Sequence, residues 1–274
     1  MMFFIAGIFF MQFYKLAVKD TPNKNISAVI MQFIAGISIL LLSPFFEFKF
    51  SHNWKIYGLL GLASVFYALN DRMQVTIRKN LDVSIYSMLG QISKVFMFFY
   101  GIILFQEKFI ISRAFGAFLI ISGSVATFYK KGKLKWNIYA TMAFLASFFC
   151  ATGFIIDVGI SDHFNIPLYI MITFIIPGIL IYFYRKFSFK ELSIEFNSKR
   201  KKYYFITGLA WGLDAFFFIR AMQLGDVTIV APLSSLIILI NVVTAYFLHK
   251  EKDGIAKKIL AALVIITGIF FLLK

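Results

Sequence analysis

Hydrophobic residues dominate ten runs of the chain, and short segments rich in lysine, arginine, asparagine and aspartate separate these runs. A helix of about 20 apolar residues is long enough to cross the hydrocarbon core of a bilayer. The pattern therefore predicts ten membrane-spanning helices joined by short connections, with no room for a separate soluble domain. The predicted spans are residues 3–18, 26–44, 55–77, 82–108, 110–129, 136–158, 166–184, 203–222, 227–248 and 255–273.

One stretch of the chain occurs twice. Residues 82–108 recur 144 residues later as residues 226–252, with seven of the 27 positions identical. The charged residues at both ends of the stretch are among the identities: Asp82/Asp226, Glu107/Glu251 and Lys108/Lys252. This match predicts a duplicated unit of five helices, with one copy in residues 1–131 and the other in residues 132–274. Because five crossings are an odd number, the second copy enters the membrane from the opposite side.

The predicted fold class is therefore an all-α integral membrane protein, with ten transmembrane helices arranged as two inverted five-helix repeats. Composition agrees with this class, since 60% of the residues are hydrophobic, 15% are charged and the mean hydropathy is +0.82. Such a chain has too little polar surface to coat a soluble globule.

The formal net charge of +15 raises the question of nucleic acid as a partner. The basic residues lie in short loops between apolar runs, without an RNA-binding motif or a platform of stacking side chains, so we predict no nucleic-acid partner. Cys150 is the single cysteine and can form neither an internal disulfide nor a thiolate metal cluster. We predict no cofactor and no metal.

The basic residues also predict an orientation. With the helices placed as above, 20 of the 28 lysine and arginine residues lie on the side opposite the termini, and five lie on the terminal side. Cytoplasmic loops carry the excess of basic residues in membrane proteins. The charges thus predict that both termini lie outside the cytoplasm, and we expect a multi-pass protein of the cell membrane.

Two charged residues lie deep inside predicted spans. Lys94 lies near the middle of residues 82–108, where a charged side chain costs about 2.5–3.5 kcal/mol on insertion scales. We interpret it as an anion-binding group that faces a central cavity; the alternatives are a structural ion pair and a side chain that reaches an interface. Asp214, near the centre of residues 203–222, is a candidate for a proton site or for binding a substrate ammonium. Its alternative roles are a salt bridge to Lys94 and a hydrogen bond with Asn70.

The duplication connects further candidates, since at the same offset Asn70 matches Asp214 and Tyr67 matches Trp211. Asn70, Trp211, Gln91 and Ser234 are candidate substrate-binding residues, with helix packing as the simpler alternative. Five more residues have predicted structural roles. We expect a local network from Asp71 and Arg72, an interface position for Asp157, and helix caps or loop ion pairs from Glu107 and Glu251.

The repeated segments resemble those of a known superfamily. The sequence VTIVAPLSSLIILINVVTAYFLHKE at 227–251, followed by a last helix with Gly268, has first-half partners VSIYSMLGQ, FQEKF and GAFLIISGSVATF. These segments are similar to the EamA-like branch of the drug/metabolite transporter superfamily, which implies ten helices built from two inverted repeats. Two features depart from that pattern. Met88 stands where the family usually has a proline, and the family usually keeps its termini in the cytoplasm.

Residues 81–94, LDVSIYSMLGQISK, are also similar to a helix of nucleotide-sugar and sugar-phosphate carriers in the same superfamily. In those carriers a tyrosine, a glutamine and a lysine help hold the substrate. The resemblance implies this role for Tyr86, Gln91 and Lys94, although Lys94 comes one residue late, which is about 100° around the helix.

The leading functional prediction is a secondary transporter that moves a small polar metabolite, such as an amino acid, by alternating access of its two repeats. Protons or a counter-substrate are candidate coupling partners, and the lipid bilayer is a further partner. The alternatives are an antiporter for nucleotide sugars or sugar phosphates, an intramembrane lipid-modifying enzyme, and a channel or scaffold. The enzyme is the weakest, because His52, His163 and His249 lie in or beside loops with no spacing for a catalytic site.

Overall fold

We describe the protein from a computed structural model. The structure describes residues 23–81, 83–129, 137–237 and 255–274, together with Gly7, Phe13, Tyr14, Ala17 and Thr21. Most of the predicted first span, the Lys130–Lys135 loop and residues 238–254 lie outside this part of the chain, and so does Glu251. Every regular element of the described residues is helical.

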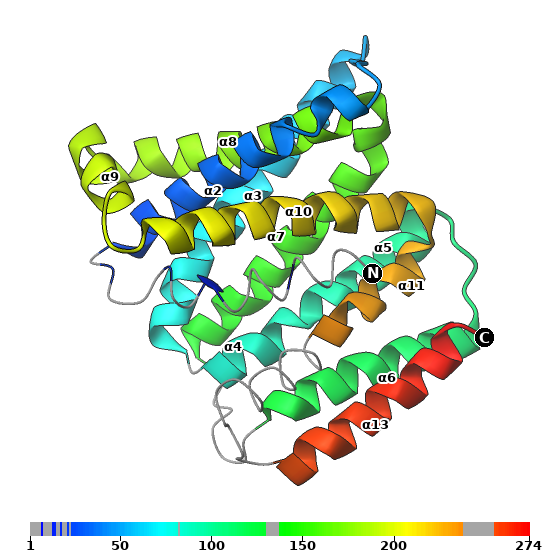
Figure 1. Cartoon of the computed structure of the whole chain (residues 1–274). Helices are drawn as coiled ribbons and strands as arrows, with labels where there is room; N and C mark the ends of the chain where they lie inside the picture. The colour runs from blue at the N-terminus through cyan, green and yellow to red at the C-terminus, as the bar shows by residue number, and fades with distance from the viewer. Residues whose placement is uncertain are drawn as a thin grey trace. The chain divides into compact units, whose positions relative to one another are not determined.

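The helices follow one another with short connections (Figure 1). They are α2 (Lys24–Leu40), η1 (Ser43–Phe45), α3 (Trp54–Asn80), α4 (Val83–Gly90), α5 (Ile92–Leu104), α6 (Ile111–Phe128), α7 (Ile138–Ile160), η2 (Ser161–His163), α8 (Ile166–Arg185), α9 (Phe189–Phe196), α10 (Lys201–Leu224), α11 (Val227–Leu233), η3 (Ser234–Leu236) and α13 (Ile255–Leu272).

Most predicted spans match one helix to within a few residues, and three observations differ from the prediction. The span predicted over 82–108 is divided into α4 and α5, and the described part of the span predicted over 227–248 is divided into α11 and η3. The short helix α9 occupies what the pattern predicted as a loop. The eight residues of α9 were missed because their mixture of apolar and charged residues is too short to show a helical period.

Four helices among the described residues are long and apolar enough to cross a membrane: Asn25–Phe45, Ile138–His163, Ile166–Arg185 and Lys201–Leu224. Four shorter apolar helices are Met88–Leu104, Ile111–Thr127, Val227–Leu236 and Ile259–Leu272. The all-α membrane class is confirmed to this extent, whereas the count of ten crossings and their inverted arrangement stay predictions.

The chain divides into two compact units. Unit 1 comprises residues 1–75 and 153–220, and unit 2 comprises residues 76–152 and 221–274, so the division falls within α3, α7 and α10. Each unit combines segments from both predicted repeats. The predicted repeats are defined by sequence similarity, whereas the two units are defined by contacts. The repeat boundary at residue 131 therefore stays a prediction.

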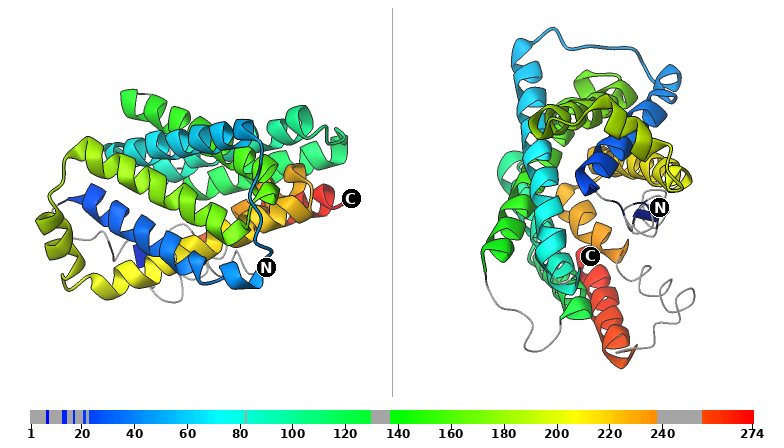
Figure 2. Two further views of the ribbon diagram at one scale, coloured as in Figure 1. Left: turned by 90° about the horizontal axis from the view of Figure 1, so that it is seen from above. Right: turned by 90° about the vertical axis from the view of Figure 1, so that its left-hand side faces the viewer.

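Unit 1 is organised around α2, which packs between α8 and α10. A Cβ atom added to Gly208 or Gly212 of α10 would lie 2.7 Å from Ile34 or Ile39 of α2, respectively, so the two helices approach closely. Gly36 of α2 lies against Ile175 of α8 in the same way, and both views of Figure 2 show these two helices as neighbours. Small residues at helix contacts allow this approach, which compensates for the weak hydrophobic driving force between helices in lipid.

The start of α8 is held by the side chain of Asn165. Its Oδ1 accepts a hydrogen bond from the backbone N–H of Leu168, which caps the helix. Its Nδ2 donates to the carbonyl oxygens of Ser43, Phe46 and Glu47 at 3.0–3.2 Å. One buried amide therefore caps α8 and fixes the loop that follows α2.

Unit 2 is centred on the pair α6 and α13, which lie side by side (Figure 1). A Cβ atom added to Gly116 would lie 2.4 Å from the backbone nitrogen of Leu272, and one added to Gly123 would lie 2.7 Å from Ile265. The later residue on α6, Gly123, contacts the earlier residue on α13, Ile265, so the two helices are antiparallel. Their contact is completed by a core that includes Phe98, Ala117 and Ile120.

The beginning of α11 is capped by a residue far away in the sequence. The Glu107 carboxylate accepts hydrogen bonds from the backbone N–H groups of Val227 and Thr228, at 2.6 and 2.9 Å. Arg113 forms an ion pair with Asp226, the residue before α11, at 2.5 Å. The capping role predicted for Glu107 is confirmed.

Candidate functional site

Two helical segments of unit 2 are interrupted at matching positions. The division between α4 and α5 lies at Gln91, where the N–H of Gln91 bonds the Met88 carbonyl and the N–H of Lys94 bonds the Gln91 carbonyl. These bonds span three residues, so the turn is tightened to 3₁₀ geometry. The second copy changes from α11 to η3 at Ser234, two residues after Pro232. Pro232, inside α11, has no backbone N–H to donate to the Thr228 carbonyl, so this short helix lacks one of its own hydrogen bonds.

The two interruptions are joined by a hydrogen bond between equivalent residues. The Ser235 hydroxyl donates to Oε1 of Gln91 at 2.9 Å, and these residues are separated by the 144 positions of the repeat. The neighbouring Ser234, which we predicted as a substrate-binding residue, directs its hydroxyl to the Ala231 carbonyl at 2.7 Å instead. Ser235 is therefore the serine that unit 2 brings to Gln91. The spacing alone did not distinguish the two, because adjacent residues on a helix face different directions.

Lys94 lies in the first turn of α5, three residues after Gln91, and its side chain is half-buried. Positions three apart on a helix are neighbours on its surface. Tyr86 of α4 is also half-buried. Unit 2 thus holds Tyr86, Gln91, Lys94 and Ser234 on two interrupted segments, in agreement with their common assignment but without testing their role.

Unit 1 contains a polar stripe along one face of α3. Nδ2 of Asn70 donates to Asp71 at 3.0 Å, Nε2 of Gln74 donates to Asn70 at 3.2 Å, and Nε2 of Gln32 in α2 donates to Asp71 at 2.5 Å. The local network predicted around Asp71 exists, but Asn70 and Gln32 contribute to it. Arg72 instead places its guanidinium 4.1 Å from the centre of the Tyr184 ring.

Trp211 of α10 packs edge-on against Phe174 of α8, with ring centroids 5.2 Å apart. This contact belongs to the hydrophobic core of unit 1 and agrees with the packing alternative for Trp211. Asp214 lies three residues further along α10 and is half-buried. Asn70, Trp211 and Asp214 belong to unit 1 and Lys94 belongs to unit 2, so a shared role for the lysine and the aspartate stays a prediction.

Asp157 is the polar residue whose importance the sequence did not indicate. Only 1% of its surface is exposed, and its two carboxylate oxygens accept hydrogen bonds from the hydroxyls of Tyr67 and Tyr169, at 2.6 and 2.5 Å. We predicted an interface position because Asp157 comes near the end of its span. α7 ends at Ile160, three residues after Asp157, so the predicted position near an interface stays a prediction, and the side chain is enclosed by α3 and α8. An acidic residue within the apolar run GFIIDVGI was the available signal.

Among the residues that the structure describes, no group of three or more histidine, cysteine, aspartate or glutamate side chains is suited to hold a metal ion. The polar groups beside the interruption in unit 2 are an amide, two hydroxyls and a lysine. Such a set can bind a polar solute through hydrogen bonds and charge complementarity.

Comparison with known proteins adds a family and a fold. No curated protein sequence matches the chain. A protein of known crystal structure, 13% identical, aligns with 98% of this chain and 97% of its own, with a TM-score of 0.72. At this identity the match shows a shared fold alone. The model of the EamA-like transporter family matches residues 137–274, half of the chain. The chain thus belongs to the EamA-like transporter family and is an integral membrane transporter.

Proposed function

We propose that the protein is a secondary transporter that moves a small polar metabolite across the cell membrane by alternating access of two inverted five-helix repeats. The observation that carries this proposal is the hydrogen bond between Gln91 and Ser235, which joins two interrupted helical segments at equivalent positions of the two repeats. Interrupted helices in corresponding positions of two halves are the sequence feature that best indicates a transporter binding site.

The geometry of the helix pairs supports the inverted repeat. The bounds of α6, Ile111–Phe128, and of α13, Ile255–Leu272, differ by the 144 residues of the repeat at both ends. These equivalent helices pack antiparallel. Helices related by an axis in the membrane plane are expected to run in opposite directions, which favours an inverted repeat over a parallel one.

The polar groups beside the interruption suggest the chemistry of the substrate. Gln91 and Ser235 offer hydrogen bonds, and the half-buried Lys94 three residues away offers a positive charge. A positive charge within the membrane favours a substrate that carries a carboxylate or a phosphate. An amino acid, which carries a carboxylate, is the leading substrate class, and Asp214 of unit 1 is a separate candidate for a proton or ammonium site.

Flux into proteoliposomes tests the proposal. Purified wild type, Lys94→Ala and Asp214→Asn are compared across a panel of amino acids, sugar phosphates and nucleotide sugars, with and without a pH gradient. Loss of a charge-assisted hydrogen bond of about 1.5–3 kcal/mol lowers substrate affinity roughly 10- to 100-fold. We expect such a loss for Lys94→Ala. Normal rates and normal pH dependence in both variants would exclude these residues from the site.

Two neighbouring serines provide a matched comparison. Ser235→Ala removes the hydroxyl that reaches Gln91, whereas Ser234→Ala removes one that is already bonded within α11. We expect the larger loss of flux from Ser235→Ala. Affinity for sugar phosphates that depends on Lys94, without amino-acid flux, would instead favour the antiporter alternative.

A further inference from the structure

The segment between α8 and α10 is the most strongly basic part of the described chain. Residues 185–202 contain seven cations and two carboxylates, Glu191 and Glu195, and so carry a formal net charge of +5. Six of the cations are exposed: Arg185, Lys186, Lys190, Lys199, Lys201 and Lys202. The segment connects the ends of two helices that are long and apolar enough to span a membrane. It is therefore held at the level where such helices leave the bilayer.

The short helix α9 within this segment presents apolar side chains outward. Phe189 is 80% exposed and Ile194 is 63% exposed, and Lys190 is exposed beside them. Leu192 and Phe196 pack against the core of unit 1, so Ile194 lies on the outer face of α9, whereas Phe189 is exposed at the N-terminal end of the helix. A helix with an inner packed face and an outer face of large apolar and basic side chains has the composition of an interfacial helix.

The helix begins with a capping box that needs no contact with the rest of the protein. The Ser188 hydroxyl accepts a hydrogen bond from the Glu191 N–H, and the Glu191 carboxylate accepts one from the Ser188 N–H at 2.8 Å. The bonds from the Ser188 backbone and hydroxyl hold the pKa of Glu191 below its ordinary value. The first turn is therefore defined locally, and one of the two acidic residues of the segment serves it.

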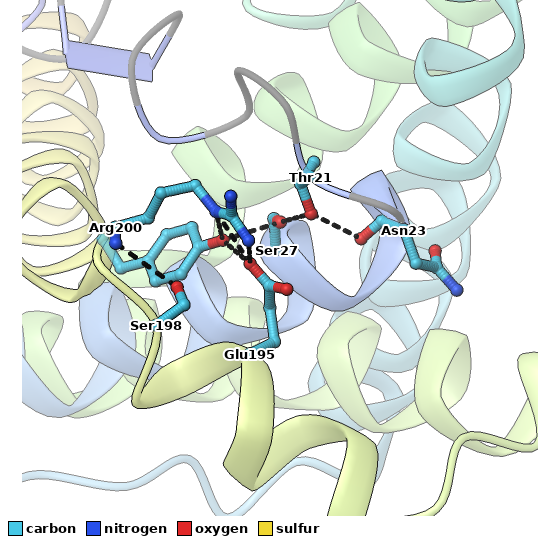
Figure 3. A network of polar contacts seen from close by, with 7 residues as sticks. Thr21, Asn23, Ser27, Glu195, Ser198 and Arg200 are labelled. Carbon is cyan, nitrogen blue, oxygen red and sulfur yellow. Dashed lines mark hydrogen bonds and ion pairs between the residues drawn. The ribbon is translucent and has the colours of Figure 1, made fainter.

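A buried ion pair fixes the end of α9 to unit 1 (Figure 3). Glu195, 6% exposed, accepts hydrogen bonds from Nε and Nη2 of Arg200 at 2.9 and 2.6 Å, and from the Tyr204 hydroxyl. Tyr204 also bonds Ser27 of α2 at 3.1 Å. The hydrogen bond between Arg200 and Tyr204 contributes most to raising the pKa of Arg200. The second acidic residue of the segment is thus occupied internally.

Both carboxylates of the segment are engaged, and the exposed cations remain directed outward. Three of them lie over aromatic rings: Lys201 4.8 Å from the Phe196 ring, Lys202 5.0 Å from the Tyr203 ring and Arg185 5.9 Å from the Tyr184 ring. These contacts place cationic groups beside the aromatic residues that are common at membrane interfaces. The surface thus combines exposed apolar side chains with positive charge that complements anionic headgroups.

We propose that α9 and its flanking lysines form a binding site for anionic phospholipids of the adjacent leaflet, with Phe189 and Ile194 inserted between the acyl chains. Clusters of four to eight basic residues on an amphipathic helix or beside a membrane span attract anionic lipids in this way. The site does not depend on the proposed transport mechanism, because it uses neither Lys94 nor Asp214.

Site-specific quenching tests the proposal in the full-length protein. Ser193, on the exposed face of α9, is replaced by cysteine in a Cys150→Ala background and labelled with bimane. The protein is reconstituted with a trace of phosphatidylglycerol or phosphatidylcholine that carries a nitroxide near the headgroup. We expect the phosphatidylglycerol label to quench several-fold more strongly, and the difference to disappear at about 1 M salt, where charges are screened within about 3 Å.

Two sets of substitutions distinguish a local site from a general charge effect. Lys186→Gln, Lys190→Gln, Lys201→Gln and Lys202→Gln together should remove most of the preference for phosphatidylglycerol, because each basic residue near the surface contributes to the attraction of anionic lipids. The control changes the four lysines of the KKGKLK loop, Lys130, Lys131, Lys133 and Lys135, to glutamine and should retain the preference. Equal quenching by both lipids in the labelled protein with all its lysines, or equal loss in the two variants, would overturn the proposal.

The apolar part of the site has its own test. Phe189→Ser with Ile194→Ser keeps every charge of the segment, and insertion predicts that quenching by a nitroxide deeper in the acyl chain falls. If the quenching at that depth is unchanged, α9 does not insert, and the proposed lipid site is rejected in this form.

Discussion

At the scale of single residues, Asp157 shows how a polar group is accommodated within a membrane helix. Its carboxylate accepts hydrogen bonds from Tyr67 of α3 and Tyr169 of α8, so one side chain connects three helices of unit 1. Unsatisfied polar groups are expensive in the bilayer core, which makes both hydroxyls important for stability.

Tyr169→Phe should destabilise the protein by about 1–2 kcal/mol, because it leaves one carboxylate oxygen without its donor. The expected observation is a lower midpoint of thermal unfolding in detergent, and Tyr67→Phe should act in the same direction. Tyr57→Phe is the matched control, since the Tyr57 hydroxyl bonds the Ser51 carbonyl of a surface loop. An equal loss of stability in Tyr57→Phe would show that the hydrogen bonds to the buried carboxylate contribute no more than a bond at the surface.

At the scale of elements, contacts between helices are determined by residues at their ends and by glycines along their faces. Glu107 stabilises α11 because a carboxylate complements the free N–H groups and the positive end of the helix dipole. Gly116 and Gly268 allow α6 and α13 to touch through their backbones.

Glu107→Ala should expose the first turn of α11 and cost about 1 kcal/mol of stability. Hydrogen exchange at the amides of Val227 and Thr228 is the direct measurement, and it should become faster. Lys108→Ala, at the exposed neighbouring position, should leave these amides unchanged. Unchanged exchange in Glu107→Ala would mean that water replaces the carboxylate without cost.

Gly116→Ala should separate α6 from α13, since the added methyl group would lie 2.4 Å from backbone rather than from a flexible side chain. Thermal unfolding should occur several degrees lower than in the wild type. Gly61→Ala is the control, because a Cβ at Gly61 in α3 meets nothing within 4 Å. There alanine should be neutral or slightly stabilising, by up to about 1 kcal/mol.

At the scale of the whole molecule, the predicted ten crossings place both termini on one side of the membrane and the α8–α10 segment on the other. The loop charges favour termini outside the cytoplasm, whereas the family usually has them inside. The charge rule is counted over short loops, and nearly all the predicted connections are short.

Single cysteines at Lys199 and Lys274, each in a Cys150→Ala background, should react on opposite sides of the membrane with an impermeant maleimide. The charge distribution predicts labelling from outside the cell at position 274 and protection at position 199. The reverse result would restore the family orientation. Labelling of both from one side would show that the number of crossings between them is even, which the ten-helix arrangement does not allow.

The hydrophobic pattern determined the class and most helix bounds, because the need for about 20 apolar residues per crossing acts locally along the chain. The position of a charge deep inside a predicted span also marked Lys94 as a candidate, and the resemblance to sugar-phosphate carriers implied a role for Gln91. The glycines of α6 and α10 are visible in the sequence, but their partners are not, because close approach depends on which helices meet.

The tertiary structure decided which polar groups meet. It paired Ser235 rather than Ser234 with Gln91, placed Asp157 between two tyrosines, and anchored α9 through Glu195 and Arg200. Each of these contacts joins side chains whose directions depend on helix rotation and packing, and these cannot be obtained from spacing along a single helix. The sequence determined that this chain forms apolar helices that insert into a membrane, and only helix packing decided which of its few polar groups contact one another.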